Sequence, residues 1–346
     1  RSLHFFKIPP KFAFLAPTVM SDEQGNLLFY SNGCKIMNRQ HELMENGDTI
    51  SPGPEYAAYC TKDFYAYDDL QGVVALPYPG HPNQYIVFHG AGDSYAPPVY
   101  PKLIYYYSII DMSLNNGLGK VIKKNQQIIG PENLMLCVTA ARHANGRDWW
   151  VIIPGRTNNI FYLFLVSPEG VKGPMVQNKQ ETWITGHTSS WAAAFSPDGS
   201  KYIRTTFSKP PRIVLFDFDR CTGMLQNPIV LNVPDTLESL YAAWPAFSPN
   251  SRYLYIQNWG KRLFQYDTWA SDISTSVIKV GEYDGFLDSA SFLYTTFHSL
   301  TNGPDGKIYM ACCEGSRYLH IIHSPDSVGL KCDFRQHNLK LPTYFA

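Results

Sequence analysis

The chain has 346 residues, and its 29 basic and 29 acidic side chains give a formal net charge of +0 at pH 7. Without a net field to draw it to nucleic acid or an anionic membrane, we expect neither partner. No apolar run approaches the roughly 20 residues that cross a bilayer, so we expect no membrane-spanning segment. The 23 tyrosines, 20 phenylalanines, 25 glycines and 25 prolines are typical of an all-β protein with many short strands.

The first predicted unit covers residues 16–38, where apolar runs flank a turn at Gly25. A polar, tyrosine-rich excursion follows over residues 39–69, and its length without periodicity fits either a binding loop or a packed structural loop. The second unit covers residues 72–124. Its last run, residues 120–124, carries lysines, as a solvent-facing outer strand does.

A strand–turn–strand pattern organises the remaining units, which cover residues 136–166, 191–231, 244–280 and 294–335. Its copies are residues 194–203, 246–255 and 303–310. In the first copy, Pro197 sets φ at the second turn position, Asp198 bonds its own backbone, and Gly199 accepts the left-handed geometry. The copies begin roughly 50 residues apart, the length of a four-stranded propeller blade.

These units predict a single all-β domain over residues 1–346, a β-propeller of four-stranded blades. Six blades fit the count of units, and a seventh assembled from the termini and the excursion is the alternative. Residues 3–8 and 338–345 are strand-like. We therefore expect the two termini to meet and close the ring, because closure removes exposed sheet edges.

Several long motifs carry a resemblance to a known family: residues 22–33 (DEQGNLLFYSNG), 107–119 (YSIIDMSLNNGLG), 143–150 (HANGRDWW), 216–223 (FDFDRCTG) and 341–344 (LPTY). With these motifs the chain resembles the secreted β-propeller proteins of Bacteroidota, which have WD40-like or TolB-like repeats. The resemblance implies an extracellular or outer-cell-surface location. Members usually end in a sorting domain for type 9 secretion, which this sequence does not contain. The resemblance implies no catalytic residue.

The seven cysteines are scattered and form no C-x-x-C pair, so we expect no zinc or haem attachment site. They fit either buried small apolar residues or, in an exported chain, disulfides. Cys34 with Cys60 is the preferred pair, because both flank the first unit.

Aromatic residues are the strongest candidates for a ligand site. Five of them lie in or just after the connections that enter the inner strands: Trp183, Trp191, Tyr241, Trp244 and Tyr294. A flat ring beside hydrogen-bonding groups suits a sugar or a peptide, whereas packing between blades is the alternative. His143, which precedes a turn, is a further candidate, although the histidines lack the spacing of metal ligands.

Four carboxylates recur near the ends of the third strands: Asp111, Asp217, Asp219 and Asp267. Because the same place is filled in several units, we expect turn caps rather than catalytic groups. We expect no metal or other cofactor. The leading hypothesis is a non-enzymatic extracellular or cell-surface binding or structural module whose blade-entry loops contact a protein or a glycan. The alternatives are a propeller hydrolase or lyase acting on polysaccharide or lactone at the channel mouth, and a subunit of a larger surface or secretion-associated assembly.

Overall fold

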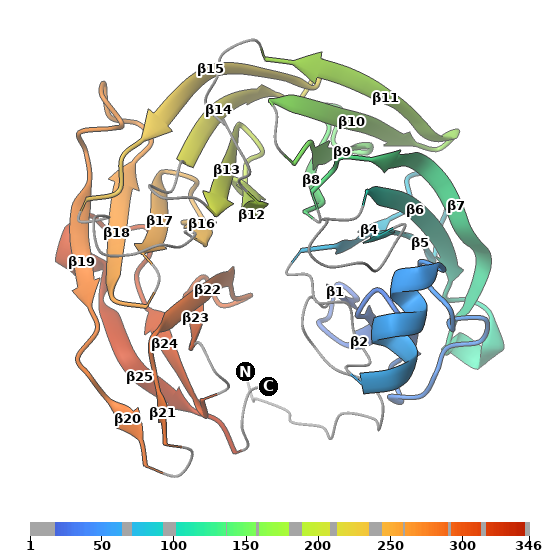
Figure 1. The fold of residues 1–346 in the computed structure, drawn as a ribbon, viewed down its shortest axis with the longest axis horizontal. Coiled ribbons are helices and arrows are strands. Elements are labelled where there is room, and N and C mark those ends of the chain that lie inside the picture. Colours follow the sequence, from blue (N-terminus) through green and yellow to red (C-terminus); the bar gives the residue numbers. More distant parts are fainter. Residues whose placement is uncertain are drawn as a thin grey trace. The chain divides into compact units, whose positions relative to one another are not determined.

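The computed structural model describes most of the chain: residues 18–63, 71–92, 102–135, 137–156, 159–179, 189–207, 213–234, 244–258, 260–289, 292–312 and 316–342. Strands dominate these residues, as the composition predicts (Figure 1). The chain forms two compact units: Arg1–Gly155 with Ile160–Val176, and Arg156–Asn159 with Gln177–Ala346.

The first unit contains three antiparallel sheets, in each of which consecutive strands lie side by side (Figure 1). The first comprises β1 (Thr18–Ser21), β2 (Leu27–Ser31) and β3 (Ile36–Asn38). The second comprises β4 (Val73–Pro77), β5 (Gln84–Gly92), β6 (Leu103–Asp111) and β7 (Lys120–Glu132). The third comprises β8 (Thr139–Arg142), β9 (Trp149–Pro154), β10 (Ile160–Ser167) and β11 (Gly170–Asn178).

The second unit repeats this layout in three further sheets. They comprise β12 (Ser189–Phe195), β13 (Lys201–Phe207), β14 (Ile213–Asp219) and β15 (Met224–Leu231); β16 (Pro245–Phe247), β17 (Tyr253–Asn258), β18 (Arg262–Asp267) and β19 (Ile278–Glu282); and β22 (Phe297–Asn302), β23 (Ile308–Cys312), β24 (Tyr318–Ile322) and β25 (Phe334–Lys340). A short ribbon of β20 (Leu287–Asp288) and β21 (Leu293–Tyr294) precedes the last sheet.

These six sheets are the blades of a β-propeller, so the predicted fold class and the preference for six blades are confirmed. Five blades have four strands, and the first has three within the described residues. Ring closure was expected from residues 3–8 and 338–345. Residues 338–340 form the end of β25 in the last blade. Residues 1–17 and 343–346 lie outside the described residues, so closure stays a prediction. A single domain over the whole chain stays a prediction.

The repeated turns have the predicted chemistry. Gly199 and Gly306 adopt the left-handed conformation, with φ of 72° and 77°. Ser251 takes the equivalent place in the middle copy, with φ of 67°. Asp198 and Asn250 each accept a backbone N–H two residues further along, at 3.0 Å in both turns. Local turn chemistry therefore fixes where each inner strand turns into the next.

Two elements differ from the sequence analysis. The third blade has an outer strand, β11, that was not predicted, because Gly173 and Pro174 interrupt its apolar pattern. An outer strand tolerates a proline because one of its edges has no strand partner. The excursion contains an eight-residue π-helix, η1 (Tyr56–Asp63), where no helix was predicted. Two shorter 3-10 helices are η2 (Asn115–Gly117) and η3 (Gly329–Cys332).

The core lies between successive sheets of each unit. Representative buried residues are Phe29 and Val87 for the first two sheets, Phe88 and Val151 for the second and third, Ile203 and Phe247 for the fourth and fifth, and Tyr255 and Phe297 for the last two. Burial of a large apolar side chain contributes about 1.5–3 kcal/mol. Blade-to-blade packing is therefore the main source of stability within each unit.

Candidate functional site

Exposed apolar side chains gather on the connection between β19 and β22, residues 283–296, which enters the last blade. We call this segment the 283–296 connection; residues 290 and 291 within it lie outside the described residues. Phe292 is 78% exposed and Tyr294 is 56% exposed, and Phe286 and Leu287 are also exposed. A concentration of exposed large apolar residues on one short element is typical of an interaction surface.

The backbone at Phe292 is strained. Its φ of 57° lies in the left-handed region, where a bulky side chain is uncommon. The backbone N–H of Phe292 donates to the carbonyl of Asp288 at 2.7 Å, which closes the ribbon of β20 and β21. Leu287 pairs with Tyr294, and Asp288 pairs with Leu293. The ribbon thus holds an exposed aromatic ring in a conformation that glycine or asparagine would adopt at lower cost.

The ribbon is anchored by a buried ion pair. The carboxylate of Asp288 is buried and accepts two hydrogen bonds from the guanidinium of Arg317, at 3.1 and 3.3 Å. On the other strand, the N–H and hydroxyl of Thr295 both donate to the carbonyl of Phe286, at 3.2 Å each. The ion pair thus fixes the ribbon to the segment that leads into β24, and the Thr295 bonds close the connection on itself.

His337 of β25 supports the base of the connection. Its imidazole stacks on the ring of Phe286 with a centroid distance of 4.3 Å. Its Nε2 lies 3.0 Å from a carboxylate oxygen of Asp284, a contact that is an ion pair only when the ring is protonated. Burial lowers the pKa of His337, and the nearby Asp284 opposes that shift. The neutral ring is therefore the favoured form in this packing.

The predicted ligand residues have different surroundings. Tyr294 lies on β21 and is exposed. Trp244 is partly buried against the core of the last two blades, 5.8 Å from the ring of His298. Burial lowers the pKa of His298. Trp183, Tyr241 and the side chain of Trp191 lie outside the described residues.

His143 belongs to the turn between β8 and β9, in the first unit. Its Nδ1 accepts the backbone N–H of Asn145 at 3.0 Å, and its ring lies 5.8 Å from that of Trp150. The structure thus gives His143 a turn-capping role.

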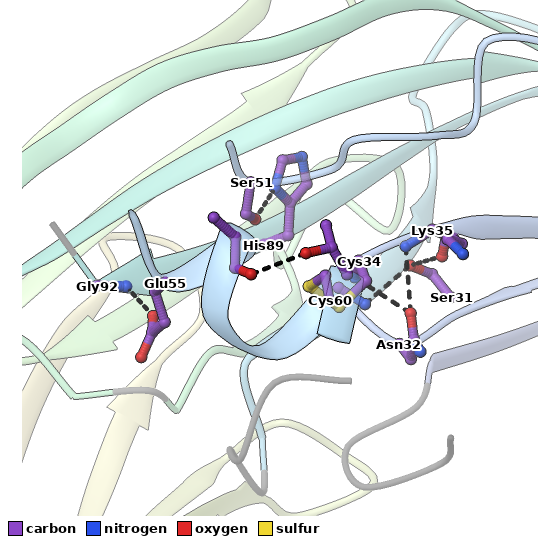
Figure 2. The surroundings of a disulfide bond; sticks show 12 residues. Ser31, Asn32, Cys34, Lys35, Ser51, Glu55, Cys60, His89 and Gly92 are labelled. Atoms are coloured by element: carbon purple, nitrogen blue, oxygen red, sulfur yellow. Dashed lines mark hydrogen bonds between the residues drawn. A yellow bond between two sulfur atoms is a disulfide. The ribbon is translucent and has the colours of Figure 1, made fainter. Parts of the chain in front are cut away.

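The disulfide between Cys34 and Cys60 is present, with the pairing that we expected (Figure 2). It fastens η1 to the loop between β2 and β3. Just before η1, the carboxylate of Glu55 accepts the backbone N–H of Gly92 at the end of β5 (Figure 2). The described part of the excursion is therefore a packed structural loop.

A buried histidine links this excursion to the second blade. In Figure 2, Ser51 lies against His89, with Oγ 2.6 Å from Nδ1. On the other side of the ring, Nε2 lies 2.9 Å from Oγ of Ser108. All three side chains are fully buried, and burial lowers the pKa of His89 to about 3. Because no atom of His89 reaches solvent, this cluster is a structural network rather than an acid–base site.

Cys312 and His320 form a second buried pair, in the last blade, with Sγ 3.3 Å from Nε2. Nδ1 of His320 accepts the N–H of His337 at 3.1 Å, so the ring proton is on Nε2, which donates to the carbonyl of Thr295 at 2.8 Å. Burial lowers the pKa of His320 to about 4. An Nε2 that carries a proton cannot deprotonate Cys312, so this pair is not an activated nucleophile.

The carboxylates after the third strands act mostly as predicted. Asp111, Asp219 and Asp267 each accept a backbone N–H two residues further along, at 2.8–3.0 Å. Asp217 differs, because it binds the side chains of Lys201 and Asn227 instead. Among the described residues, no group of three His, Cys, Asp or Glu side chains is placed to hold a metal ion.

Sequence reasoning found Tyr294 but not Phe292 or Phe286. It placed the start of the last blade's inner strand at residue 294, whereas β22 begins at Phe297. The available signal was the apolar run Phe292, Leu293 and Tyr294 in the segment between β19 and β22.

Comparisons with known proteins agree with the fold. A putative 6-phosphogluconolactonase from Bacteroides uniformis superposes with a TM-score of 0.53 at 13% identity, over 99% of this chain and 89% of that chain. The periplasmic gluconolactonase PpgL of Pseudomonas aeruginosa gives 0.47 at 13% identity, over 75% and 69% of the two chains. The β-propeller domain of Myceliophteria thermophila Cps50 (Swd1) gives 0.42 at 13% identity, over 75% and 67%.

No protein-family profile and no curated protein matches the sequence. Within the part of the chain that the structure describes, no helix has the length and apolar character needed to cross a bilayer. The fold defines the class of the protein as a β-propeller, as the sequence motifs predicted.

Proposed function

We propose that this β-propeller is a non-enzymatic binding module that engages a protein partner through the 283–296 connection. The observation that carries the proposal is Phe292, a ring that is 78% exposed on a backbone with a φ of 57°. Strain of about 1–3 kcal/mol acts against folding, and an exposed ring gains no burial energy to offset it, so stability does not explain this arrangement. A partner that buries the ring explains the arrangement.

The chemistry of the connection favours a protein over a glycan. Phe292 and Tyr294 lie beside Leu287, so the exposed side chains offer mainly apolar area. A sugar needs directional polar groups beside the ring, but the two nearby carboxylates contact Arg317 and His337 instead. A buried phenylalanine contributes about 1.5–3 kcal/mol, the magnitude of an interface hot spot.

We further propose that the protein acts outside the cell or on its outer surface, as the resemblance of its motifs implies. The Cys34–Cys60 disulfide supports this location, because disulfides persist mainly in oxidising compartments. Measurement of free thiols in protein taken directly from the native cells tests it. Seven reactive thiols per unfolded chain would contradict the proposed location.

The test of the binding function compares two equally exposed positions. Phe292→Asn removes the ring while fitting the left-handed backbone, and Leu330→Asn removes an apolar side chain that is also 78% exposed but lies on η3. A photo-crosslinking residue at position 292 identifies the partner. The affinity of the purified protein for that partner is then measured for the wild type and for each variant. We expect Phe292→Asn to weaken binding about tenfold or more and Leu330→Asn to leave it unchanged. Equal affinities for both variants would overturn the proposal.

A hydrolase acting on polysaccharide or lactone is the second hypothesis, and an assembly subunit is the third. Turnover of gluconolactone or 6-phosphogluconolactone by the purified protein would favour the second. A glycan array whose signal disappears in Phe292→Asn would replace the protein partner with a sugar. A stable homo-oligomer that dissociates in the same variant would favour an assembly role.

A further inference from the structure

The base of the 283–296 connection contains an unusual arrangement around His337. Leu319 of β24 pairs with Leu339 of β25, and Ile321 pairs with Arg335. One residue of β24, His320, therefore faces the three residues 336–338 of β25. This bulge gives His337 a left-handed φ of 43°. Bulges commonly re-aim a side chain, and here the imidazole points at the connection rather than along the sheet.

Three contacts tie His337 and its neighbour to the connection. The imidazole stacks on Phe286 at 4.3 Å, and Nε2 lies 3.0 Å from Asp284. Asp284 also accepts the backbone N–H of Phe286 at 3.0 Å. In addition, the N–H of Asp284 donates to the side chain of Gln336 at 3.2 Å. Asp284 and Phe286 are thus held by the bulge and by each other.

We propose that His337 is a proton-operated latch that holds the 283–296 connection closed at neutral pH and releases it on acidification. The inference rests on the proposed function for its purpose, since it adds regulation to the same surface, but its test needs no partner. In the closed form, the neutral ring packs between Phe286 and the last blade. A protonated ring prefers water, so proton uptake favours the form in which Phe286 is released.

The groups that face His337 set the direction of the response. Asp284 of the connection favours the protonated ring, whereas burial opposes it and is the larger effect. From β24, His320 lies 5.4 Å away between ring centroids and is neutral, and Tyr318 presents its ring edge at 6.4 Å. On β25 itself, Arg335 is paired with Asp333, and Lys340 lies over the ring of Tyr318. Asp284 is therefore the carboxylate in contact with the ring, because Asp333 is paired with Arg335.

The sign of the effect follows from linkage. The closed form has a lowered pKa for His337, so it binds fewer protons than the open form near pH 6. The closed form is therefore favoured above the ordinary histidine pKa of about 6.5 and loses that advantage as the pH falls below it. Asp284→Asn removes the opposing anion and should make release more sensitive to acid.

Amide hydrogen exchange tests the latch in the whole protein. Protection of the peptide covering residues 283–296 is measured at about pH 7 and about pH 5, after correction for the intrinsic exchange rate, with the peptide covering residues 246–255 as reference. One proton changes the opening equilibrium by at most about tenfold per pH unit. We expect protection of the connection to fall over this range within that limit, while the reference peptide changes little.

Two variants make the test specific. His337→Phe keeps a ring against Phe286 but cannot be protonated, so the pH response of the connection should disappear. His323→Gln removes a neighbouring half-buried histidine that bonds Asn338 at 2.7 Å, and the response should persist. A wild-type connection whose protection does not change would overturn the latch, as would an equal fall in His337→Phe. Since no partner enters this measurement, failure of the latch leaves the binding proposal to its own experiment.

Discussion

The hydroxyl of Ser251 accepts the backbone N–H of Asp198 at 3.0 Å, which joins the turn of the fourth blade to the turn of the fifth. The next turn repeats the connection with different groups, because the N–H of Asn250 donates to the carboxylate of Asp326 at 2.9 Å. Ser251 stands where the other two copies have glycine, and it has their left-handed backbone. The serine therefore keeps a strained left-handed backbone and in return forms a hydrogen bond between the two blades.

This exchange predicts different outcomes for two substitutions. Ser251→Ala keeps the strain and leaves the N–H of Asp198 without its acceptor, which should destabilise the protein by about 1–2 kcal/mol. Ser251→Gly also loses the bond but relieves about 1 kcal/mol of strain, so its stability should lie close to that of the wild type. Urea unfolding measures both. If alanine proves no worse than glycine, the hydroxyl has no role between the blades.

Loss of the disulfide should weaken the first unit. The bridge closes a loop with a sequence separation of 26 residues, for which chain entropy gives about 3.5 kcal/mol. The double variant Cys34→Ala and Cys60→Ala should lose about that much stability, because its unfolded chain is less constrained. Denaturant unfolding of oxidised samples provides the measurement. Cys221→Ser is the control, since Cys221 is exposed and outside the disulfide, and it should show no change.

Buried His89 should make the protein sensitive to acid. Its pKa of about 3 in the folded state lies below the ordinary value of about 6.5, so the unfolded chain binds the extra proton. Stability is therefore intact above about pH 6.5 and falls toward pH 3, with about 2 kcal/mol lost between pH 7 and pH 5. Unfolding free energies of the wild type and His89→Gln at both pH values isolate this contribution. Between pH 7 and pH 5, the unfolding free energy of the glutamine variant should fall by about 2 kcal/mol less than that of the wild type. Equal falls in the two proteins would contradict the assignment.

Gly281 leaves room for a ring of the next blade. A Cβ at this position would lie 2.5 Å from two atoms of the Phe334 ring, so Gly281→Ala should destabilise by about 1–3 kcal/mol through overpacking. Phe334→Leu makes space, so the two substitutions together should cost less than the sum of their separate effects. Thermal unfolding of the three variants gives the coupling. Strict additivity would mean that β19 and β25 do not pack in this way.

The blades could be predicted from the sequence because their turns are local. Pro197, Asp198 and Gly199 determine a turn from within a few residues, and the same chemistry recurs in the fifth and sixth blades. The pairing of Cys34 with Cys60 was also within reach, because both flank one unit. By contrast, β11 was hidden by Pro174, whose effect depends on whether a strand lies at a sheet edge.

The surroundings of each aromatic ring were decided only by the tertiary structure. Trp244 and Tyr294 occupy similar places in the chain, yet the first packs against a core and the second faces solvent. Burial depends on residues brought together from different blades, and periodicity within one strand does not encode it. The bulge that aims His337 at Phe286 likewise depends on the register between β24 and β25, which sequence alone leaves open. Short-range turn chemistry is thus written in the sequence, whereas exposure and register arise from long-range packing.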